Sequence, residues 1–221
     1  MNLFCPETKL PKKNTFVLLS LFCIALLGTA WLSDDSAITL RTVLNFLHGF
    51  GPNFNSDERV QAYTHPLWFL LITALTIITG NIFVAVFFLC ISCSLLTLWF
   101  LLRYIARDYK TMLLALAILL LSKAYLDFST SGLENSLSHL LIVLGVIQSL
   151  SVLENKTQTQ PTPCLMTFAL LYLSRPDLIL LVLPIALLIL YLSYRTFKQL
   201  CKTLFIISID VSNNRNCGSQ I

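Results

Sequence analysis

Residues 34–68, DDSAITLRTVLNFLHGFGPNFNSDERVQAYTHPLW, form the long polar interval in the first half of this chain. Apolar stretches of membrane-spanning length flank the interval, from residue 15 to 32 and from residue 82 to 102. Four of the eleven acidic residues lie inside it: Asp34, Asp35, Asp57 and Glu58. The pattern favours a reactive loop held between membrane spans.

The composition places the chain among membrane proteins. Of its 221 residues, 56% are hydrophobic and only 12% are charged, whereas soluble domains carry about a quarter charged residues. No basic run with interleaved aromatic residues occurs, so nucleic acid is excluded as a partner and the lipid bilayer is expected instead. The seven cysteines are scattered singly, which predicts no disulfide framework. The predicted fold is all-α: a polytopic transmembrane helical bundle with amphipathic interfacial helices in the first outer loop.

Two helices are predicted inside that loop. One runs from Ser36 to about His48, with Asp34 or Asp35 as its N-cap and Gly49 as its stop. Its apolar residues recur at helical spacing on one face, as in a helix that lies on a membrane surface. The second runs from His65 to Thr79, which at about 15 residues is short for a span.

Charge decides how the second helix is placed. If both 65–79 and 82–102 crossed the membrane, the basic residues Arg103, Arg107 and Lys110 would lie outside, against the positive-inside rule. We therefore predict an interfacial or half-inserted helix at 65–79. The six predicted spans are then 15–32, 82–102, 111–125, 137–153, 164–174 and 178–194.

This arrangement predicts a multi-pass protein of the bacterial inner (plasma) membrane with a cytoplasmic N-terminus and the first loop outside. Four basic residues before the tail fall on the outer side: Arg41, Arg59, Lys123 and Arg175. Ten fall inside: Lys9, Lys12, Lys13, Arg103, Arg107, Lys110, Lys156, Arg195, Lys198 and Lys202. The predicted division is a cytoplasmic tail at 1–14 and a transmembrane core at 15–202, with its outer loop at 33–81. Residues 203–221 are interpreted as an aborted span and a non-native tail.

The segment 164–174 is too short to cross alone, so Arg175 and Asp177 are expected below the outer surface. Ionisable residues at such depth usually face a cavity or each other. The alternative is an Arg175–Asp177 pair that only ends the helix. His139, inside a predicted span, is expected to be a satisfied core residue.

Several motifs together carry a family resemblance. The pair Asp34-Asp35, the loop residues Glu58-Arg59-Val60, Ser131-Gly132-Leu133-Glu134 and Arg175-Pro176-Asp177 resemble bacterial GT-C-type glycosyltransferases. The chain is similar to the N-terminal half of terminal arabinofuranosyltransferases and mannosyltransferase-like membrane proteins, over roughly residues 15–195. The resemblance implies transfer of a sugar from a polyprenyl-phosphate donor to a hydroxyl of a cell-envelope glycan or lipid acceptor.

The resemblance also implies roles for individual residues. Asp34 and Asp35 become the catalytic carboxylates, and they are the ligands of a divalent metal if one binds. Donor and phosphate binding is expected from Arg41, Glu58, Arg59, Tyr63, His65, Glu134, Arg175 and Asp177. Helix capping is the structural alternative for the aspartate pair. Two other functions stay open: an inactive truncated product, since this chain alone is expected not to turn over, and a transporter or channel component.

Overall fold

The computed structural model describes residues 12–55, 63–106, 108–154 and 160–194, and its regular structure in these ranges is helical. The elements are α1 (Lys12–Gly28), α2 (Asp34–Leu47), α3 (Pro66–Thr79), α4 (Ile82–Phe100), a π-helical turn η1 (Leu101–Ile105), α5 (Tyr109–Leu121), α6 (Lys123–Thr130), α7 (Asn135–Glu154), α8 (Thr162–Ser174) and a 3-10 turn η2 (Pro176–Leu178). The turn η2 opens a final helical stretch, Pro176–Tyr194. The predicted all-α membrane fold is confirmed.

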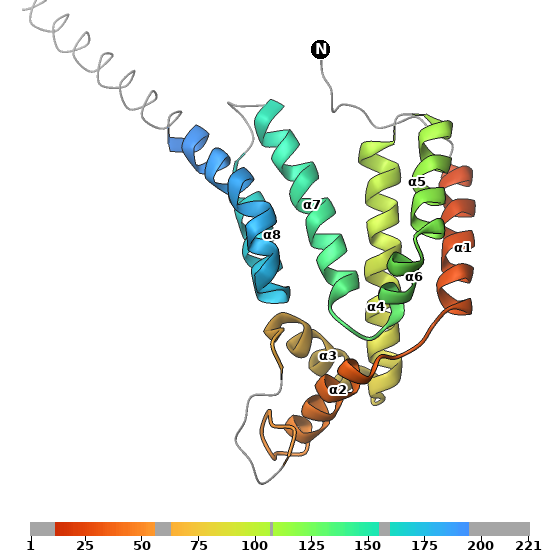
Figure 1. Cartoon of the computed structure of the whole chain (residues 1–221), viewed down its shortest axis with the longest axis vertical. Helices are drawn as coiled ribbons and strands as arrows, with labels where there is room; N and C mark the ends of the chain where they lie inside the picture. Colours follow the sequence, from red (N-terminus) through yellow and green to blue (C-terminus); the bar gives the residue numbers. More distant parts are fainter. Residues whose placement is uncertain (1–11, 56–62, 107, 155–159, 195–221) are drawn as a thin grey trace, which may run out of the picture.

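The long helices stand side by side, and α2 and α3 lie at the lower end of the bundle (Figure 1). Helix α4 is the centre of the packing because it belongs to both hydrophobic cores. Its first half, including Val86 and Cys90, packs in a core with α3, α7 and α8. Its last turns, including Leu98, pack in a core with α1 and α5.

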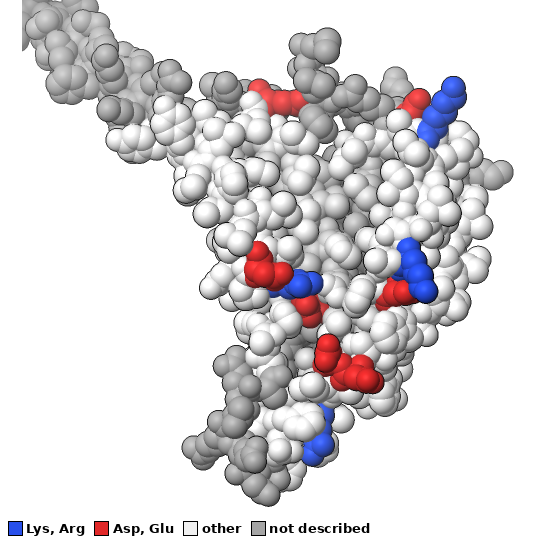
Figure 2. Space-filling model, viewed as in Figure 1, with Lys and Arg blue, Asp and Glu red and all other residues white. Residues whose placement is uncertain are grey.

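The outer surface of the bundle is apolar. Large hydrophobic side chains such as Leu121 (84% exposed), Ile78 (78%) and Leu180 (77%) point away from the protein. Figure 2 shows one group of charged side chains at the upper end and another from mid-height downwards, with an uncharged zone between the two groups. Such a surface suits hydrocarbon and would be an aggregation hazard in water.

Fewer helices than predicted are long enough to span a membrane by themselves. Among the described residues, three are long and apolar enough: Ile82–Ile105, Asn135–Glu154 and Pro176–Tyr194. The predicted spans 15–32 and 164–174 appear as the shorter helices Asn14–Gly28 and Thr162–Ser174.

The predicted span 111–125 is not one straight helix, because the helix breaks at Ser122. Helices α5 and α6 meet there at 73°, and they make a fourth candidate span only if the bent pair is counted as one. The Ser122 hydroxyl accepts a hydrogen bond from the Tyr125 backbone N–H at 3.3 Å, which starts the new helix. Beyond the bend, α6 packs against α4 and α7.

The predicted N-cap of α2 is also wrong. Ser33 caps the helix, since its hydroxyl accepts a hydrogen bond from the Ser36 N–H at 3.1 Å. Asp34 and Asp35 lie in the first turn instead. The predicted stop is confirmed: the helix ends at Leu47, and Gly49 follows with a φ of 84°.

Helix α3 forms as predicted and packs against α2, α4 and α8. It ends at Gly80, whose φ of 68° is left-handed, and Asn81 then caps α4 by accepting hydrogen bonds from two backbone N–H groups. This tight turn sets α3 against α4, and α2 packs against α3. The predicted core at 15–202 lies mainly within the described residues, whereas the segments 1–11 and 203–221 lie outside them.

Candidate active site

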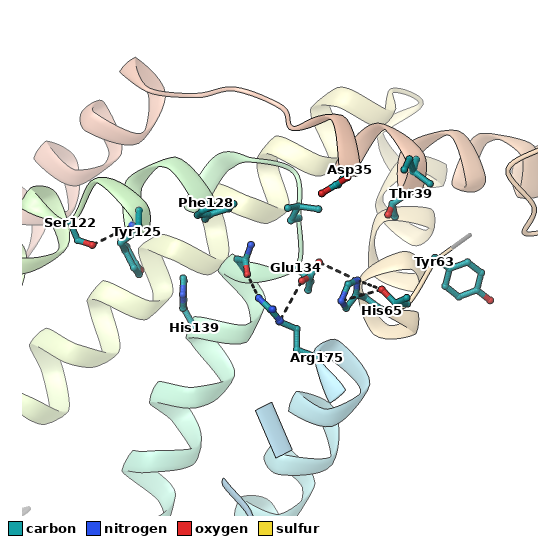
Figure 3. Close-up of a pocket in the computed structure, with 15 residues that line it drawn as sticks. Asp35, Thr39, Tyr63, His65, Ser122, Tyr125, Phe128, Glu134, His139 and Arg175 are labelled. Atoms are coloured by element: carbon teal, nitrogen blue, oxygen red, sulfur yellow. Dashed lines mark hydrogen bonds and ion pairs between the residues drawn. The ribbon is translucent and has the colours of Figure 1, made fainter. Parts of the chain in front are cut away.

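A cavity of about 800 Å³ opens at the lower end of the bundle, where segments far apart in the sequence meet. Helix α2 contributes Asp35, Ile38 and Thr39, and the segment before α3 contributes residues 63–65. The other walls come from α6, from the start of α7 and from Arg175. Figure 3 shows the side chains around this space. Its volume is that of a small-molecule site.

The turn between α6 and α7 holds these walls together. Its Ser131 carbonyl accepts a hydrogen bond from the Ser33 N–H at 2.9 Å, which ties down the start of α2. Its Gly132 carbonyl accepts one from the indole N–H of Trp68 at 3.0 Å, which ties down α3. Gly132 has a φ of +81°, and a Cβ there would lie 2.7 Å from the Leu32 side chain. A glycine is therefore required at this position.

Glu134 is the buried acidic residue of the cavity, with 4% of its surface exposed. One carboxylate oxygen lies 3.3 Å from Nδ1 of His65, and the other lies 3.7 Å from Nε of Arg175. A carboxylate this buried needs such partners, because an unpaired buried charge is costly. Glu134 thus fixes both basic side chains at the cavity wall.

Three side chains contact Arg175: Glu134, Asn135 and Asp177. It donates to the Asn135 side-chain oxygen at 2.6 Å, and its Nε and NH2 groups donate to the two carboxylate oxygens of Asp177 at 3.2 and 3.1 Å. The Asp177 side chain is 61% exposed, so this fork-shaped pair lies at the open edge of the site. Both alternatives from the sequence hold in part, since Arg175 ends α8 as its C-cap and also lines the cavity.

Asp35 points from α2 towards the same space (Figure 3). It lies in the first turn of the helix, where the unpaired backbone N–H groups favour an acidic side chain. Among the described residues no hydrogen bond or ion pair engages its carboxylate. It is therefore an acceptor that remains open to a ligand.

Comparison with known proteins identifies the family. The model of the Alg9-like mannosyltransferase family matches residues 54–213, well over half of the chain. The chain belongs to that family.

Two relatives are terminal β-(1→2)-arabinofuranosyltransferases. The protein from Mycobacterium tuberculosis is 36% identical over 129 residues, which cover 53% of this chain and 20% of the relative. The protein from Corynebacterium glutamicum is 51% identical over 49 residues, which cover 22% of this chain and 7% of the relative. The chain thus matches a fifth or less of the length of these relatives. No solved structure matches the chain.

The match to this glycosyltransferase family begins at residue 54, after α2, so it includes His65, Glu134 and Arg175 but not the aspartate pair. The structure separates that pair: Asp35 lines the cavity, whereas Asp34 is not among the lining residues. The two carboxylates are neighbours on the helix and point about 100° apart, and only that of Asp35 borders the cavity.

Some of the other predicted site residues line the cavity, and others do not. Tyr63 and His65 line the cavity, and Tyr63 also stacks on Phe69 with ring centroids 4.5 Å apart. Arg41 lies elsewhere, with its guanidinium over the Phe54 ring at 4.4 Å. Glu58 and Arg59 lie outside the described residues.

The described residues do not form a ready metal site. No group of three or more His, Cys, Asp or Glu side chains stands close enough together to hold an ion in these parts of the chain. Asp34 and Asp35 supply at most two carboxylates and point in different directions, so no step below is routed through a metal.

The sequence did not single out the wall formed by Tyr125, Phe128 and His139. The rings of Tyr125 and His139 stack with centroids 4.8 Å apart. The prediction that His139 is a satisfied core residue is wrong, because the ring lines the cavity and its Nδ1 has no hydrogen-bond partner among the described residues.

Proposed function

We propose that this chain forms the donor-binding part of a membrane glycosyltransferase, which moves a sugar from a polyprenyl phosphate to a hydroxyl of a cell-envelope acceptor. The supporting observation is the cavity in which Asp35, Glu134 and Arg175 meet from three distant segments. Family membership supports the reaction class, and the relatives' names support a glycosyl acceptor.

We propose that Asp35 acts as the general base. Its open carboxylate accepts the proton of the acceptor hydroxyl while the hydroxyl oxygen attacks the anomeric carbon. The bond from that carbon to the phosphate oxygen breaks, and the polyprenyl phosphate leaves with the bonding electrons. Charge therefore develops on the phosphate and needs a fixed cation nearby.

Arg175 is the cation that we propose for the phosphate. Asn135 and Glu134 hold it on the buried side, and the exposed Asp177 carboxylate occupies its fork on the open side. A phosphate has the same two-oxygen geometry as that carboxylate, so it can replace Asp177 without moving the arginine. In this account Asp177 occupies the phosphate position until a donor binds.

The cavity end is proposed to face the outside of the bacterial plasma membrane. In the structure, the α6–α7 turn lies at the end of the bundle opposite the α4–α5 connection (Figure 1). The ten-to-four distribution of basic residues supports placing the α4–α5 connection inside. The donor would then approach along the outer leaflet.

Equilibrium binding to the chain in lipid nanodiscs tests the proposal without requiring turnover. Farnesyl phosphate is the probe, and farnesol, which lacks the phosphate, is the matched ligand. We expect preferential binding of farnesyl phosphate, a loss of about tenfold or more in Arg175→Gln, and tighter binding in Asp177→Asn. Lys123→Gln is the control, since Lys123 begins α6 and is also basic but does not line the cavity. Equal affinity for both probes, or unchanged binding in Arg175→Gln, contradicts the phosphate assignment.

A further inference from the structure

The wall formed by Tyr125, Phe128 and His139 differs chemically from the rest of the cavity. It offers stacked rings, whereas the charged groups of the cavity are the Asp35 carboxylate and the Glu134–Arg175 pair (Figure 3). The break at Ser122 builds this wall, because the 73° bend turns α6 so that Tyr125 meets His139 of α7. The two sets of groups therefore suit two different parts of a ligand.

The two ring nitrogens of His139 are in unequal positions. Nδ1 is buried and has no hydrogen-bond partner among the described residues, so Nε2 is the nitrogen left on the cavity side. A neutral imidazole has one N–H donor and one bare acceptor nitrogen. A proton on Nδ1 would bury a donor with nothing to accept it, and such orphan donors are rarer than orphan acceptors. The favoured tautomer thus presents Nε2–H to the cavity.

We infer that the Tyr125–His139 wall binds an uncharged sugar ring, with Nε2–H of His139 donating a hydrogen bond to a sugar oxygen. A sugar ring has apolar C–H groups that pack against aromatic side chains, and hydroxyl groups around its edge that can accept the Nε2–H hydrogen bond. Asp35 accepts hydrogen bonds and meets the hydroxyl edge. This inference rests on the proposed function for the reaction. It adds that the sugar and the phosphate bind to different walls of the cavity.

Two amide variants of His139 test which ring nitrogen donates the hydrogen bond. Glutamine places its amide near the position of Nε2, whereas asparagine places its amide near Nδ1. Octyl mannoside and octyl arabinofuranoside, which contain a sugar but no phosphate, are the probes, and binding is measured in nanodiscs. We expect His139→Asn to weaken glycoside binding by about three- to tenfold, the effect of one lost neutral hydrogen bond. His139→Gln should stay within about twofold of the wild type, because the donor is retained.

Farnesyl phosphate, which carries no sugar, is the control ligand for the glycosides. Its binding also shows that each variant is folded. Its affinity should be the same in the wild type and both variants, because it carries no sugar oxygen to accept a hydrogen bond from Nε2–H. Farnesyl phosphoryl mannose then identifies the source of the sugar. A loss of its binding in His139→Asn assigns the wall to the donor sugar, and unchanged binding assigns it to the sugar of the acceptor.

The experiment distinguishes failure of the sugar-binding wall from failure of the proposed function. Glycoside binding that is unchanged in His139→Asn overturns the inference, and so does equal weakening in both amide variants. Failure of the wild type to bind either glycoside while it binds farnesyl phosphate also overturns the inference but leaves the phosphate site standing. Failure of farnesyl phosphate to bind the wild type refutes the proposed function instead.

Discussion

At the scale of single residues, the two adjacent aspartates of α2 have different surroundings. Both side chains are exposed, but only Asp35 lines the cavity. Asp35→Cys and Asp34→Cys should both react with a water-soluble thiol reagent, and farnesyl phosphate should slow the reaction only in Asp35→Cys. Mass spectrometry of the peptide that contains the new cysteine gives the rate without interference from native thiols. Protection of Asp34→Cys alone would reverse our assignment of the base.

Single residues were the scale at which the sequence was least informative about the site. The family resemblance of the motifs implied Asp35, Glu134 and Arg175, and the short segment before Arg175 also indicated that this side chain faces a cavity. The sequence did not reveal the role of His139, since whether a ring nitrogen finds a partner depends on packing between helices. It also placed Arg41 in the site, whereas the nearby Phe54 ring engages that side chain.

At the scale of elements, the turn between α6 and α7 determines whether the cavity exists. Gly132→Ala should lower the free energy of unfolding by about 1–3 kcal/mol, because alanine is strained at a positive φ and its Cβ would contact Leu32 and Ser36. Denaturant titration of the purified protein in detergent measures the change. Gly28→Ala is the matched control, because a Cβ at Gly28 meets nothing within 4 Å, and it should change stability by less than about 1 kcal/mol. Equal effects of the two substitutions would show that the turn is not under this constraint.

Elements were predicted well where one physical signal dominated. The start of α4 at Ile82 and the end of α3 at Thr79 follow from a glycine and an asparagine between two apolar runs. The break at Ser122 was missed because the surrounding run is apolar enough to continue as one helix. Its signal was the polar pair Ser122-Lys123, since serine is a good N-cap and lysine is costly inside a membrane.

At the scale of the whole molecule, the two ends of the bundle should lie on opposite sides of the membrane. Asn55→Cys should react with a membrane-impermeant maleimide in intact cells, because Asn55 follows α2, which lies at the cavity end. Asp108→Cys should react only after the cells are permeabilised, because Asp108 begins α5 at the other end. The reverse labelling pattern would place the cavity inside the cell and would exclude a donor from the outer leaflet.

The central claim is that a polyprenyl-phosphate donor binds in the cavity between α2, α6 and α7. Photo-crosslinking measures this most directly, with a farnesyl phosphate that bears a diazirine on its first isoprene unit and with crosslinked peptides identified by mass spectrometry. We expect crosslinks to peptides that contain Asp35, Glu134 or Arg175, and excess unmodified farnesyl phosphate should remove them. Crosslinks confined to the apolar groove between α1 and α4, lined by Phe16, Leu19, Cys23 and Trp99, would contradict it.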